Sequence, residues 1–204
     1  MPLVHSLFLS THVNAHFWKV EKTETSLLEH LPLNACDEQL LAKKKKAADR
    51  YSFLAVRALL QAVGCTASVV YDAQGAPTLS NGQRLSISHT HHYVAVVLSD
   101  QLPVGIDVEA YRPKIARIAP RFMHTSEAFA NTLPLMTQLW TAKEAVYKAL
   151  RQPGIHFAEH IHIEQFTANT ATATATVWHN SRQQEFSLTF VSLNEHCATI
   201  ALPK

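Results

Sequence analysis

The order of a helix, a turn and a set of strands occurs twice along this chain of 204 residues. In the first half, apolar side chains at helical spacing predict an amphipathic helix over 49–60 that ends near Gly64. Turn residues follow at 71–77, and apolar alternation then predicts strands at 84–89 and 93–98. A helix that precedes paired strands is typical of an α+β unit.

The second half repeats this outline. We expect a helix through 139–150, several strands from Ile161 onward, and a closing strand at 197–202 that has the small apolar residues of the earlier one. The chain is therefore predicted to be an α+β protein whose two similar halves pack as an intramolecular pseudo-dimer. We expect an N-terminal half of 1–103 and a C-terminal half of 104–204, with a ligand bound between them.

Composition narrows the class of protein. The formal charge of +2 is too small to indicate nucleic-acid binding and suits an acidic partner or a polyanionic small ligand equally well. The cysteines Cys36, Cys65 and Cys197 are widely spaced, which is typical of a reduced intracellular protein. The N-terminal residues lack the basic start of a signal peptide, and no segment reaches the roughly 18 apolar residues of a membrane span. We expect a cytoplasmic protein without a membrane segment.

Two carboxylates stand two residues apart in the segment 105–109, which reads Gly-Ile-Asp-Val-Glu. Side chains at i and i+2 of a strand leave the same face, so Asp107 and Glu109 should aim at one point. The alternating positions, which face the other side of the strand, hold the apolar residues Val104, Ile106 and Val108. Two adjacent carboxylates repel each other unless a cation or a proton lies between them. Mg²⁺ held partly by ligand phosphates would satisfy them, and the alternative is a solvent-facing pair at a sheet edge.

The segment 140–148 reads Trp-Thr-Ala-Lys-Glu-Ala-Val-Tyr-Lys and lies within the predicted second helix. Glu144 and Lys148 are one turn apart, so they share one side of that helix. Taken alone, such a cluster is most often a solvated ion pair. Together with Lys143 and the two acids of 105–109, it supplies three carboxylates and two lysines. Those groups suit a cation-assisted reaction on a phosphate ester.

Other candidate residues are less specific. His89, which follows Ser88 at a strand end, could contact a phosphate or be an ordinary strand-end histidine. Arg57 lies inside an otherwise apolar helix and needs an anion, either a carboxylate or a phosphate. Charge runs such as 43–46 are mostly solvated. A transition-metal site would draw on His156, His160 and His162, although no acid or cysteine completes a recognisable set.

The segments 105–109 and 140–148, read as Gly-Ile-Asp-Val-Glu and Trp-x-x-Lys-Glu-Ala-x-x-Lys, resemble the two signature motifs of the 4′-phosphopantetheinyl transferase superfamily. The upstream residues 87–89, Ile-Ser-His, are similar to the family's Ser-His segment. The resemblance extends over about residues 38 to 165 and is closest to the pseudo-dimeric members that activate peptide and polyketide synthetases.

This resemblance implies transfer of the 4′-phosphopantetheine arm of coenzyme A (CoA) to a serine of an apo acyl- or peptidyl-carrier protein, with 3′,5′-ADP as the other product. It implies a Mg²⁺-dependent monomer. By the same resemblance, Asp107, Glu109 and Glu144 would hold the metal. Glu144 would also help to deprotonate the carrier serine, and Lys148 would stabilise charge on the pyrophosphate; with Asp107 these two form the implied catalytic set.

The resemblance also implies a CoA-binding set, which consists of His89, Ser88, Arg50, Arg57, Lys143 and Lys44. One departure concerns residues 74–77, Gln-Gly-Ala-Pro, where many relatives have Gly-Lys-Pro with a lysine that meets a CoA phosphate. Ala76 cannot make that contact, so Arg84 or Lys114 would have to replace it. Two alternatives stay open: a non-catalytic module that binds CoA or a nucleotide, and a histidine-ligated metallohydrolase.

Overall fold

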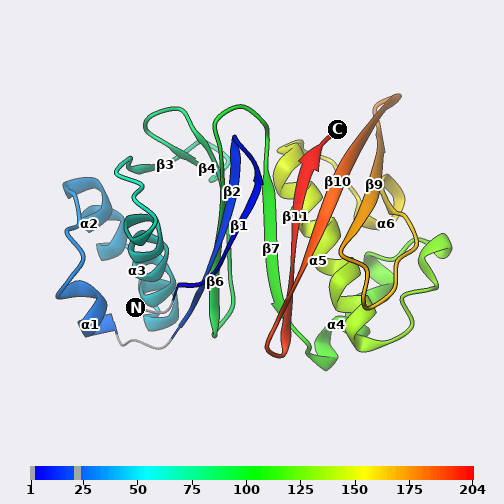
Figure 1. The fold of residues 1–204 in the computed structure, drawn as a ribbon, viewed down its shortest axis with the longest axis horizontal. Helices are drawn as coiled ribbons and strands as arrows, with labels where there is room; N and C mark the ends of the chain where they lie inside the picture. The colour runs from blue at the N-terminus through cyan, green and yellow to red at the C-terminus, as the bar shows by residue number, and fades with distance from the viewer. Residues whose placement is uncertain (1–2, 21–23) are drawn as a thin grey trace.

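The computed structural model describes residues 3–20 and 24–204. Its first half contains β1 (Leu3–Ser10), β2 (Val13–Lys19), α1 (Glu24–Leu28), α2 (Ala35–Ala42), α3 (Ala47–Ala62), β3 (Val69–Tyr71), β4 (Pro77–Leu79), β5 (Arg84–His89) and β6 (Tyr93–Ser99). Its second half contains β7 (Gly105–Ala110), α4 (Pro113–Ile118), η1 (Ala119–Arg121), η2 (Thr125–Glu127), α5 (Leu133–Leu150), α6 (Phe157–His160), β8 (Ile161–Ile163), β9 (Thr172–His179), β10 (Arg182–Leu193) and β11 (His196–Pro203). The helices lie at the two outer sides and the sheets between them (Figure 1).

The two sheets have the same strand order. Apart from the additional edge strand β1, the first sheet runs β2-β6-β5-β4-β3 and the second runs β7-β11-β10-β9-β8. In each half the first strand pairs antiparallel with the last one, and the strands after the long helix form a meander. The predicted α+β class with two similar halves is therefore confirmed.

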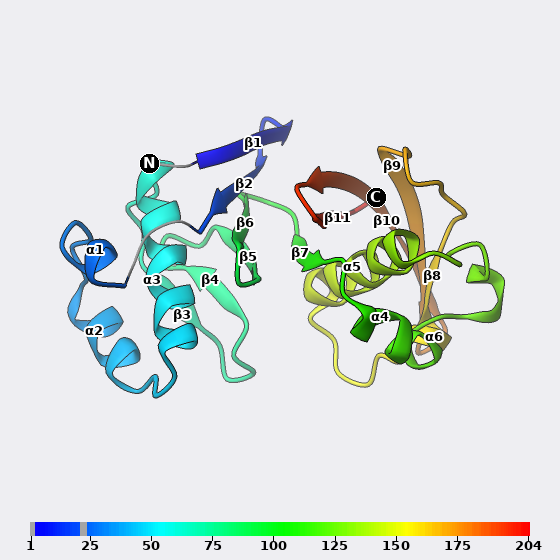
Figure 2. The same ribbon diagram turned by 90° about the horizontal axis from the view of Figure 1, so that it is seen from below.

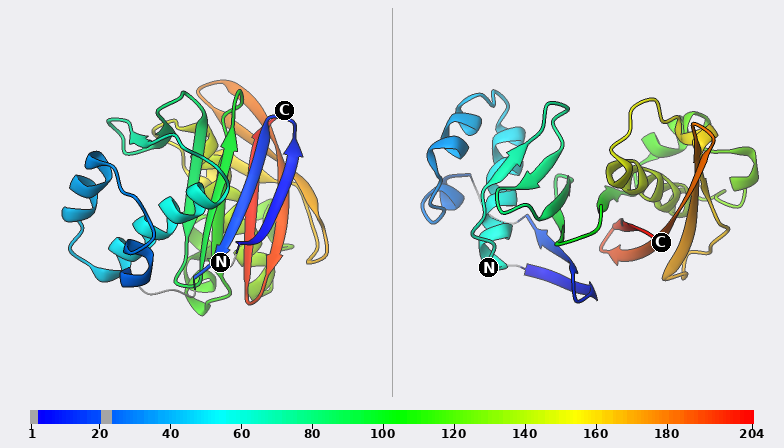
Figure 3. Two further views of the ribbon diagram at one scale, coloured as in Figure 1. Left: turned by 60° about the vertical axis from the view of Figure 1, so that its left-hand side comes forward. Right: turned by 90° about the horizontal axis from the view of Figure 1, so that it is seen from above.

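Three apolar clusters hold the layers together. Helix α3 packs on one face of the first sheet around Leu54 and Leu59, and α5 packs on one face of the second around Leu139 and Val146. The remaining faces of the two sheets pack against each other in a third cluster that includes Ile106. Figures 2 and 3 show the resulting order of helices, sheet, sheet and helices.

The predicted elements are present, with one notable difference in length. The helix expected over 49–60 is α3, and the strands expected over 84–89 and 93–98 are β5 and β6. Helix α5 begins earlier than expected, at Leu133, because the side chain of Thr132 accepts a hydrogen bond from the Leu135 amide and caps the helix. Within the described residues, no helix combines the length and the apolar character needed to cross a lipid bilayer.

Candidate active site

Strand β7 meets helix α5 at Gly105, and this contact brings the two motif segments together. A Cβ atom at position 105 would lie 1.8 Å from the carbonyl oxygen of Ala145 and 2.9 Å from the amide nitrogen of Ala149. The backbone of α5 therefore touches the backbone of β7 at a place where any side chain would collide with it. As a consequence, polar side chains on α5 reach the carboxylates of β7.

Asp107 is the centre of this contact. Its Oδ1 atom accepts hydrogen bonds from Lys148 Nζ at 2.6 Å and from Ser88 Oγ at 2.8 Å, and the Asp107 residue is only 8% exposed. Lys148 Nζ also donates to the carbonyl oxygen of Ile106 at 3.0 Å. Burial raises the pKa of the Asp107 carboxyl above its ordinary value, and the Lys148 ammonium and Ser88 hydroxyl oppose that rise. The two motif segments therefore form one site.

Glu144 belongs to the same electrostatic group. Burial raises the pKa of its carboxyl to about 7; the negative charges of Asp107 and Glu109 add to the rise, and Lys148 opposes it. A carboxyl with a pKa near 7 can accept or release a proton at neutral pH, which is the property of a general base. Three carboxylates and one ammonium group thus share a small region at the junction of the two halves.

The carboxylates of this group have the chemistry of Mg²⁺ ligands but are paired with protein cations in this structure. Glu109 accepts hydrogen bonds from the side chain of Arg112 and from the Ala110 amide, while Asp107 is paired with Lys148. Among the described residues, no three acidic, histidine or cysteine side chains are spaced to hold one metal ion together. The oxygen donors fit a hard cation, although the predicted set of Asp107, Glu109 and Glu144 is not assembled around one point.

A cavity of about 290 Å³ lies on the N-terminal side of this group. It brings together the predicted residues Lys44, Arg57 and His89, and its walls include Phe53 and Tyr71. The Arg57 guanidinium lies 3.7 Å from the centre of the Phe53 ring. Burial lowers the pKa of His89, and the positive charges of Lys148 and Lys44 lower it further. Asp49 also lines this cavity, so Lys44 is the side chain whose positive charge is most available there. Its ammonium group and the flat aromatic walls suit a ligand with a planar ring and a phosphate group.

Two further cavities adjoin the acidic group. One, of about 480 Å³, has His89, Glu109 and Arg112 among its lining residues. The other, of about 350 Å³, has Glu144 beside the aromatic residues Trp140 and Phe122. His89 lines both the first of these and the cavity of Lys44, so ligand-sized spaces border the acidic group on several sides.

Lys143, predicted to bind CoA, is a structural residue. Its side chain is fully buried, its Nζ lies 2.6 Å from Glu127 Oε2, and it donates to the carbonyl oxygens of Phe157 and Ile161. Glu127 also accepts hydrogen bonds from the backbone amides of His124 and Ile163, so the pair links α5 to η2 and β8. The expectation for Lys143 is corrected, because no ligand can reach its ammonium group.

Ser88 and Arg50 also have protein partners. Ser88 is buried, and besides its bond to Asp107 its hydroxyl accepts the Val108 amide at 3.1 Å, so it links β5 to β7. Arg50 lies 2.7 Å from Glu24 Oε1 and donates to the carbonyl of Leu41, which ties α3 to α1 and α2. Neither position supports direct CoA binding as the sequence predicted, because both side chains are engaged by the fold.

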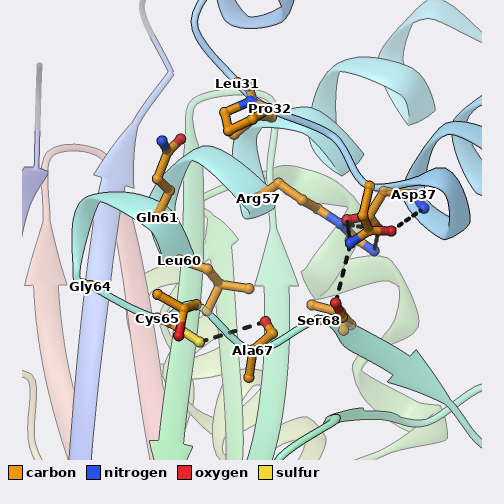
Figure 4. A pocket seen from close by; sticks show the side chains of 13 residues that line it. Leu31, Pro32, Asp37, Arg57, Leu60, Gln61, Gly64, Cys65, Ala67 and Ser68 are labelled. Carbon is orange, nitrogen blue, oxygen red and sulfur yellow. Dashed lines mark hydrogen bonds and ion pairs between the residues drawn. The ribbon is translucent and has the colours of Figure 1, made fainter.

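Arg57 satisfies its need for an anion with a carboxylate. Its Nε and Nη2 atoms donate to Asp37 Oδ1 at 3.0 and 2.8 Å, and both side chains are almost fully buried. The same pair and Cys65 line a second N-terminal cavity, of about 320 Å³ (Figure 4). Arg57 thus forms part of the wall of two cavities, and its charge is already neutralised.

Several residues of the site had no usable sequence signal. Phe53 reads as a core residue and Tyr71 as a turn residue, yet both line the cavity of Lys44. Neither Arg84 nor Lys114, the candidates to replace a lysine at position 76, is among the lining residues of that cavity. The two motif segments could be recognised in the sequence because the residues of each are neighbours along the chain. The aromatic residues of the cavity wall come from separate elements, so no local pattern marks them.

The histidines of the second half have local partners. The His156 amide donates to His160 Nδ1 at 2.9 Å, and a ring nitrogen of His162 lies 3.0 Å from the Glu159 carbonyl oxygen. In the part of the chain that the structure describes, these histidines do not form a group able to hold a metal ion. The structure therefore gives no support to a histidine-ligated hydrolase.

Comparison with known proteins places the two motif segments within one family of sequences. Residues 103–201 match the family model of the 4′-phosphopantetheinyl transferase superfamily. The chain is 31% identical over 123 residues to the 4′-phosphopantetheinyl transferase AcpT of Salmonella typhi, covering 54% of this chain and 64% of that protein. It is 31% identical over 111 residues to AcpT of Escherichia coli K12, covering 48% of this chain and 57% of that protein.

A putative 4′-phosphopantetheinyl transferase of Synechocystis is 33% identical over 92 residues, which cover 39% of this chain and 37% of that protein. In each of these comparisons the match spans less than two thirds of the relative's own length. Residues 103–201, a little under half of the chain, therefore match the 4′-phosphopantetheinyl transferase superfamily, which confirms the resemblance carried by the two motif segments.

Proposed function

We propose that this protein transfers the 4′-phosphopantetheine group of CoA to a serine of an apo acyl- or peptidyl-carrier protein and releases 3′,5′-ADP. The observation that carries the proposal is the Asp107–Lys148 pair, which joins both family motifs at 2.6 Å with Glu144 in the same electrostatic group. The halves 1–103 and 104–204 would act as the two domains of a cytoplasmic monomer, because one chain supplies both sides of the site.

The cavity of Lys44 and His89 is the proposed site for the 3′-phosphoadenosine part of CoA. The ammonium of Lys44 would neutralise phosphate charge, and His89 would add a hydrogen bond. Phe53 and Tyr71 provide flat surfaces for the adenine ring, and Arg57 supports the Phe53 ring from within the wall. From this cavity the pyrophosphate would reach Lys148 and the acidic group.

Mg²⁺ is the proposed metal, and Asp107, Glu109 and Glu144 would hold it. When bound, it would neutralise charge on the pyrophosphate. Two observations support an oxygen-ligated cation here. Asp107 and Glu109 are close enough to Glu144 to add to the rise that burial causes in its pKa, and carboxylate oxygens suit a hard ion. Binding would require Glu109 to give up Arg112, and Asp107 to share its oxygen atoms with the ion and Lys148.

Lys148 and Glu144 would have different roles in the transfer step. The serine oxygen would form a bond to the phosphorus that carries the pantetheine, and the bond from that phosphorus to the bridging oxygen would break. The electron pair leaves with 3′,5′-ADP, and Lys148 stabilises the negative charge as it develops. Glu144 would accept the serine proton, for which a pKa of about 7 is suited. The cavity that Trp140, Phe122 and Glu144 line would be the route of the carrier serine to Glu144.

Intact-mass analysis tests the proposal. Apo-carrier proteins incubated with the enzyme, CoA and Mg²⁺ should each gain the mass of one phosphopantetheine group, and omission of the metal should prevent the gain. Glu144→Gln should slow transfer by about 100-fold or more, because it removes the base and keeps the shape of the side chain. Glu159→Gln, an exposed glutamate on α6, is the matched control and should transfer normally.

The outcomes separate the candidate functions. CoA binding without any mass gain on a broad set of carriers would favour a non-catalytic CoA-binding module. Normal transfer by Glu144→Gln would remove Glu144 from the mechanism. No binding of CoA at all would reject the proposed function.

A further inference from the structure

Arg151 has a backbone conformation that its residue type rarely adopts. It follows the last residue of α5 with φ 50° and ψ 35°, in the left-handed region where glycine is the usual residue. The other described non-glycine residues with positive φ are Asn180, Ser181 and Glu195, which lie in the turns of two β-hairpins. An arginine held in this conformation at a helix end suggests that its side chain has a role.

The side chain of Arg151 crosses from the C-terminal half to the N-terminal half. Its Nη2 atom donates to the carbonyl oxygen of Pro77 at 2.6 Å and to that of Leu85 at 3.0 Å. These residues lie in β4 and β5, whose described ladder consists of the single pair Thr78–Arg84. Proline has no N–H group, so it cannot extend this ladder as a donor. The guanidinium therefore links two strands where their own pairing has stopped.

The two ends of this link are parts of the proposed enzyme site. Pro77 lines the cavity of Lys44 and His89, and α5 carries Glu144 and Lys148. We propose that Arg151 is a positioning residue, which holds the wall of the CoA cavity in place relative to the reactive groups of α5. This inference rests on the proposed function.

The charges around Arg151 support a specific role for its hydrogen bonds. Partial burial lowers its pKa, the positive charge of Arg84 lowers it further, and Asp72 opposes both effects. The guanidinium therefore lies near another positive charge, that of Arg84. Its hydrogen bonds to the carbonyl oxygens of Pro77 and Leu85 and the negative charge of Asp72 offset this repulsion. The expected consequence of losing the side chain is a displaced cavity wall and an intact helix.

The substitution Arg151→Gly removes the side chain and keeps the backbone conformation, because glycine adopts the left-handed conformation without strain. Arg151→Lys keeps a cation that can donate to both carbonyl oxygens. Asn180→Gly is the matched control, since it makes the same backbone change in the β9–β10 turn. For each full-length variant we would measure the Kd of 3′,5′-ADP, which fills only the proposed cavity, together with the KM for CoA, kcat and Tm.

Arg151→Gly is expected to raise the Kd of 3′,5′-ADP and the KM for CoA by about tenfold, the order of the loss of two hydrogen bonds, with an unchanged or higher Tm. Arg151→Lys should restore most of the affinity, and amide hydrogen exchange at Ala76, Thr78 and Leu79 should be faster in the glycine variant alone. Wild-type affinity, KM and exchange in Arg151→Gly would overturn the inference while leaving the proposed function standing. A wild-type protein that binds neither CoA nor 3′,5′-ADP would reject the proposed function, and this role of Arg151 with it.

Discussion

The two halves of the molecule share one strand order but use their long helices differently. Helix α3 contacts its sheet through large apolar side chains such as Phe53, Leu54 and Leu59. Helix α5 touches the backbone of β7 directly, because residue 105 is a glycine. The closer approach in the C-terminal half lets short polar side chains on the strand meet lysine and glutamate on the helix. One topology therefore provides a helix that packs through apolar side chains in the first half and, in the second, a helix whose lysine and glutamate lie beside the strand carboxylates.

The ion pairs of the two halves show the same division. Arg57 and Asp37 join α3 to α2, and the side chains of Lys143 and Glu127 are both 0% exposed inside the C-terminal half. In contrast, 28% of the Lys148 side chain is exposed, so its pair with Asp107 is held by the fold and still open to a ligand. Accessibility, more than charge, distinguishes the candidate catalytic pair from these two buried pairs.

The largest expected effect is on the buried pair of the C-terminal half. Lys143→Met should lower the free energy of unfolding by about 3–5 kcal/mol, because Glu127 would be left as an unpaired charge in the core. Arg57→Met, the matched change in the N-terminal half, should cost about 2 kcal/mol, because Asp37 lines a cavity and its side chain is 8% exposed, so water can solvate the charge that is left. Urea unfolding of both variants measures the difference.

A double variant tests whether the loss of stability comes from the unpaired charge of Glu127. Adding Glu127→Gln to Lys143→Met should recover a large part of the loss, because the uncharged amide oxygen can still accept a backbone N–H. Equal losses for Lys143→Met and Arg57→Met would contradict the contrast between the two halves.

Gly105→Ala tests the close contact between α5 and β7. The new Cβ atom would lie 1.8 Å from the Ala145 carbonyl oxygen, so the helix must move away from the strand. We expect a loss of about 3 kcal/mol in the free energy of unfolding, at the upper end of typical overpacking effects. Transfer activity should fall further than stability explains, because the separation would lengthen the contact of Lys148 with Asp107.

Ala55→Gly is a control within α3. Ala55 is fully buried, so the change should cost about 1 kcal/mol in helix propensity and about 1 kcal/mol more for the lost buried methyl group, and it should leave CoA binding intact. A Gly105→Ala variant with wild-type stability would show that the two backbones are not in the contact described.

The sequence predicted the local part of this site well. A period of two places Asp107 and Glu109 on one strand face, and a period of four stacks Glu144 over Lys148, so each half of the site follows from neighbouring residues. The strands 84–89 and 93–98 were likewise visible, because alternation and turn residues are local signals. The approach of α5 to β7 was not predicted, since it depends on how a helix and a strand pack in space.

The partners of the charged residues could not be predicted from the sequence. Lys143 finds Glu127 in a short 3₁₀ turn, and Arg50 finds Glu24 across 26 positions of sequence. Both lysine and arginine can pair with either kind of anion. The residue type therefore does not tell whether the partner is a phosphate or a carboxylate. For Arg57 both possibilities stood, and the fold selects Asp37. Long-range contacts of this kind are set by tertiary packing alone.

The pH dependence of stability should also differ between the halves. Burial raises the pKa of Glu144 from 4.5 to about 7, so the folded protein binds this proton more tightly than the unfolded chain. The protonated Glu144 carboxyl makes its full contribution to the free energy of unfolding below about pH 4.5. This contribution is lost as the pH rises toward 7 and above, and the loss is about 2 kcal/mol after allowance for partial exposure. Glu144→Gln should lack this loss, whereas Glu38→Gln on α2 should retain it.

Denaturant unfolding from pH 4.5 to 8, without metal, measures this difference. Saturating Mg²⁺ should flatten the profile of the wild-type protein, because a bound cation favours the ionised carboxyl. Identical profiles for the wild-type protein and Glu144→Gln would mean that Glu144 is not buried among like charges.

The smallest expected effect separates two basic residues of the N-terminal half. Arg50→Ala removes a partly exposed ion pair with Glu24, so the free energy of unfolding should fall by less than about 1 kcal/mol and the Kd of CoA should not change. Lys44→Ala should leave stability unaltered but weaken CoA binding by about tenfold, because Lys44 lines the proposed cavity. Titration calorimetry at two salt concentrations checks both variants, and the affinity of Lys44→Ala should depend less on salt than that of the wild-type protein. A larger loss of CoA affinity in Arg50→Ala than in Lys44→Ala would move the binding site away from the cavity and toward α1.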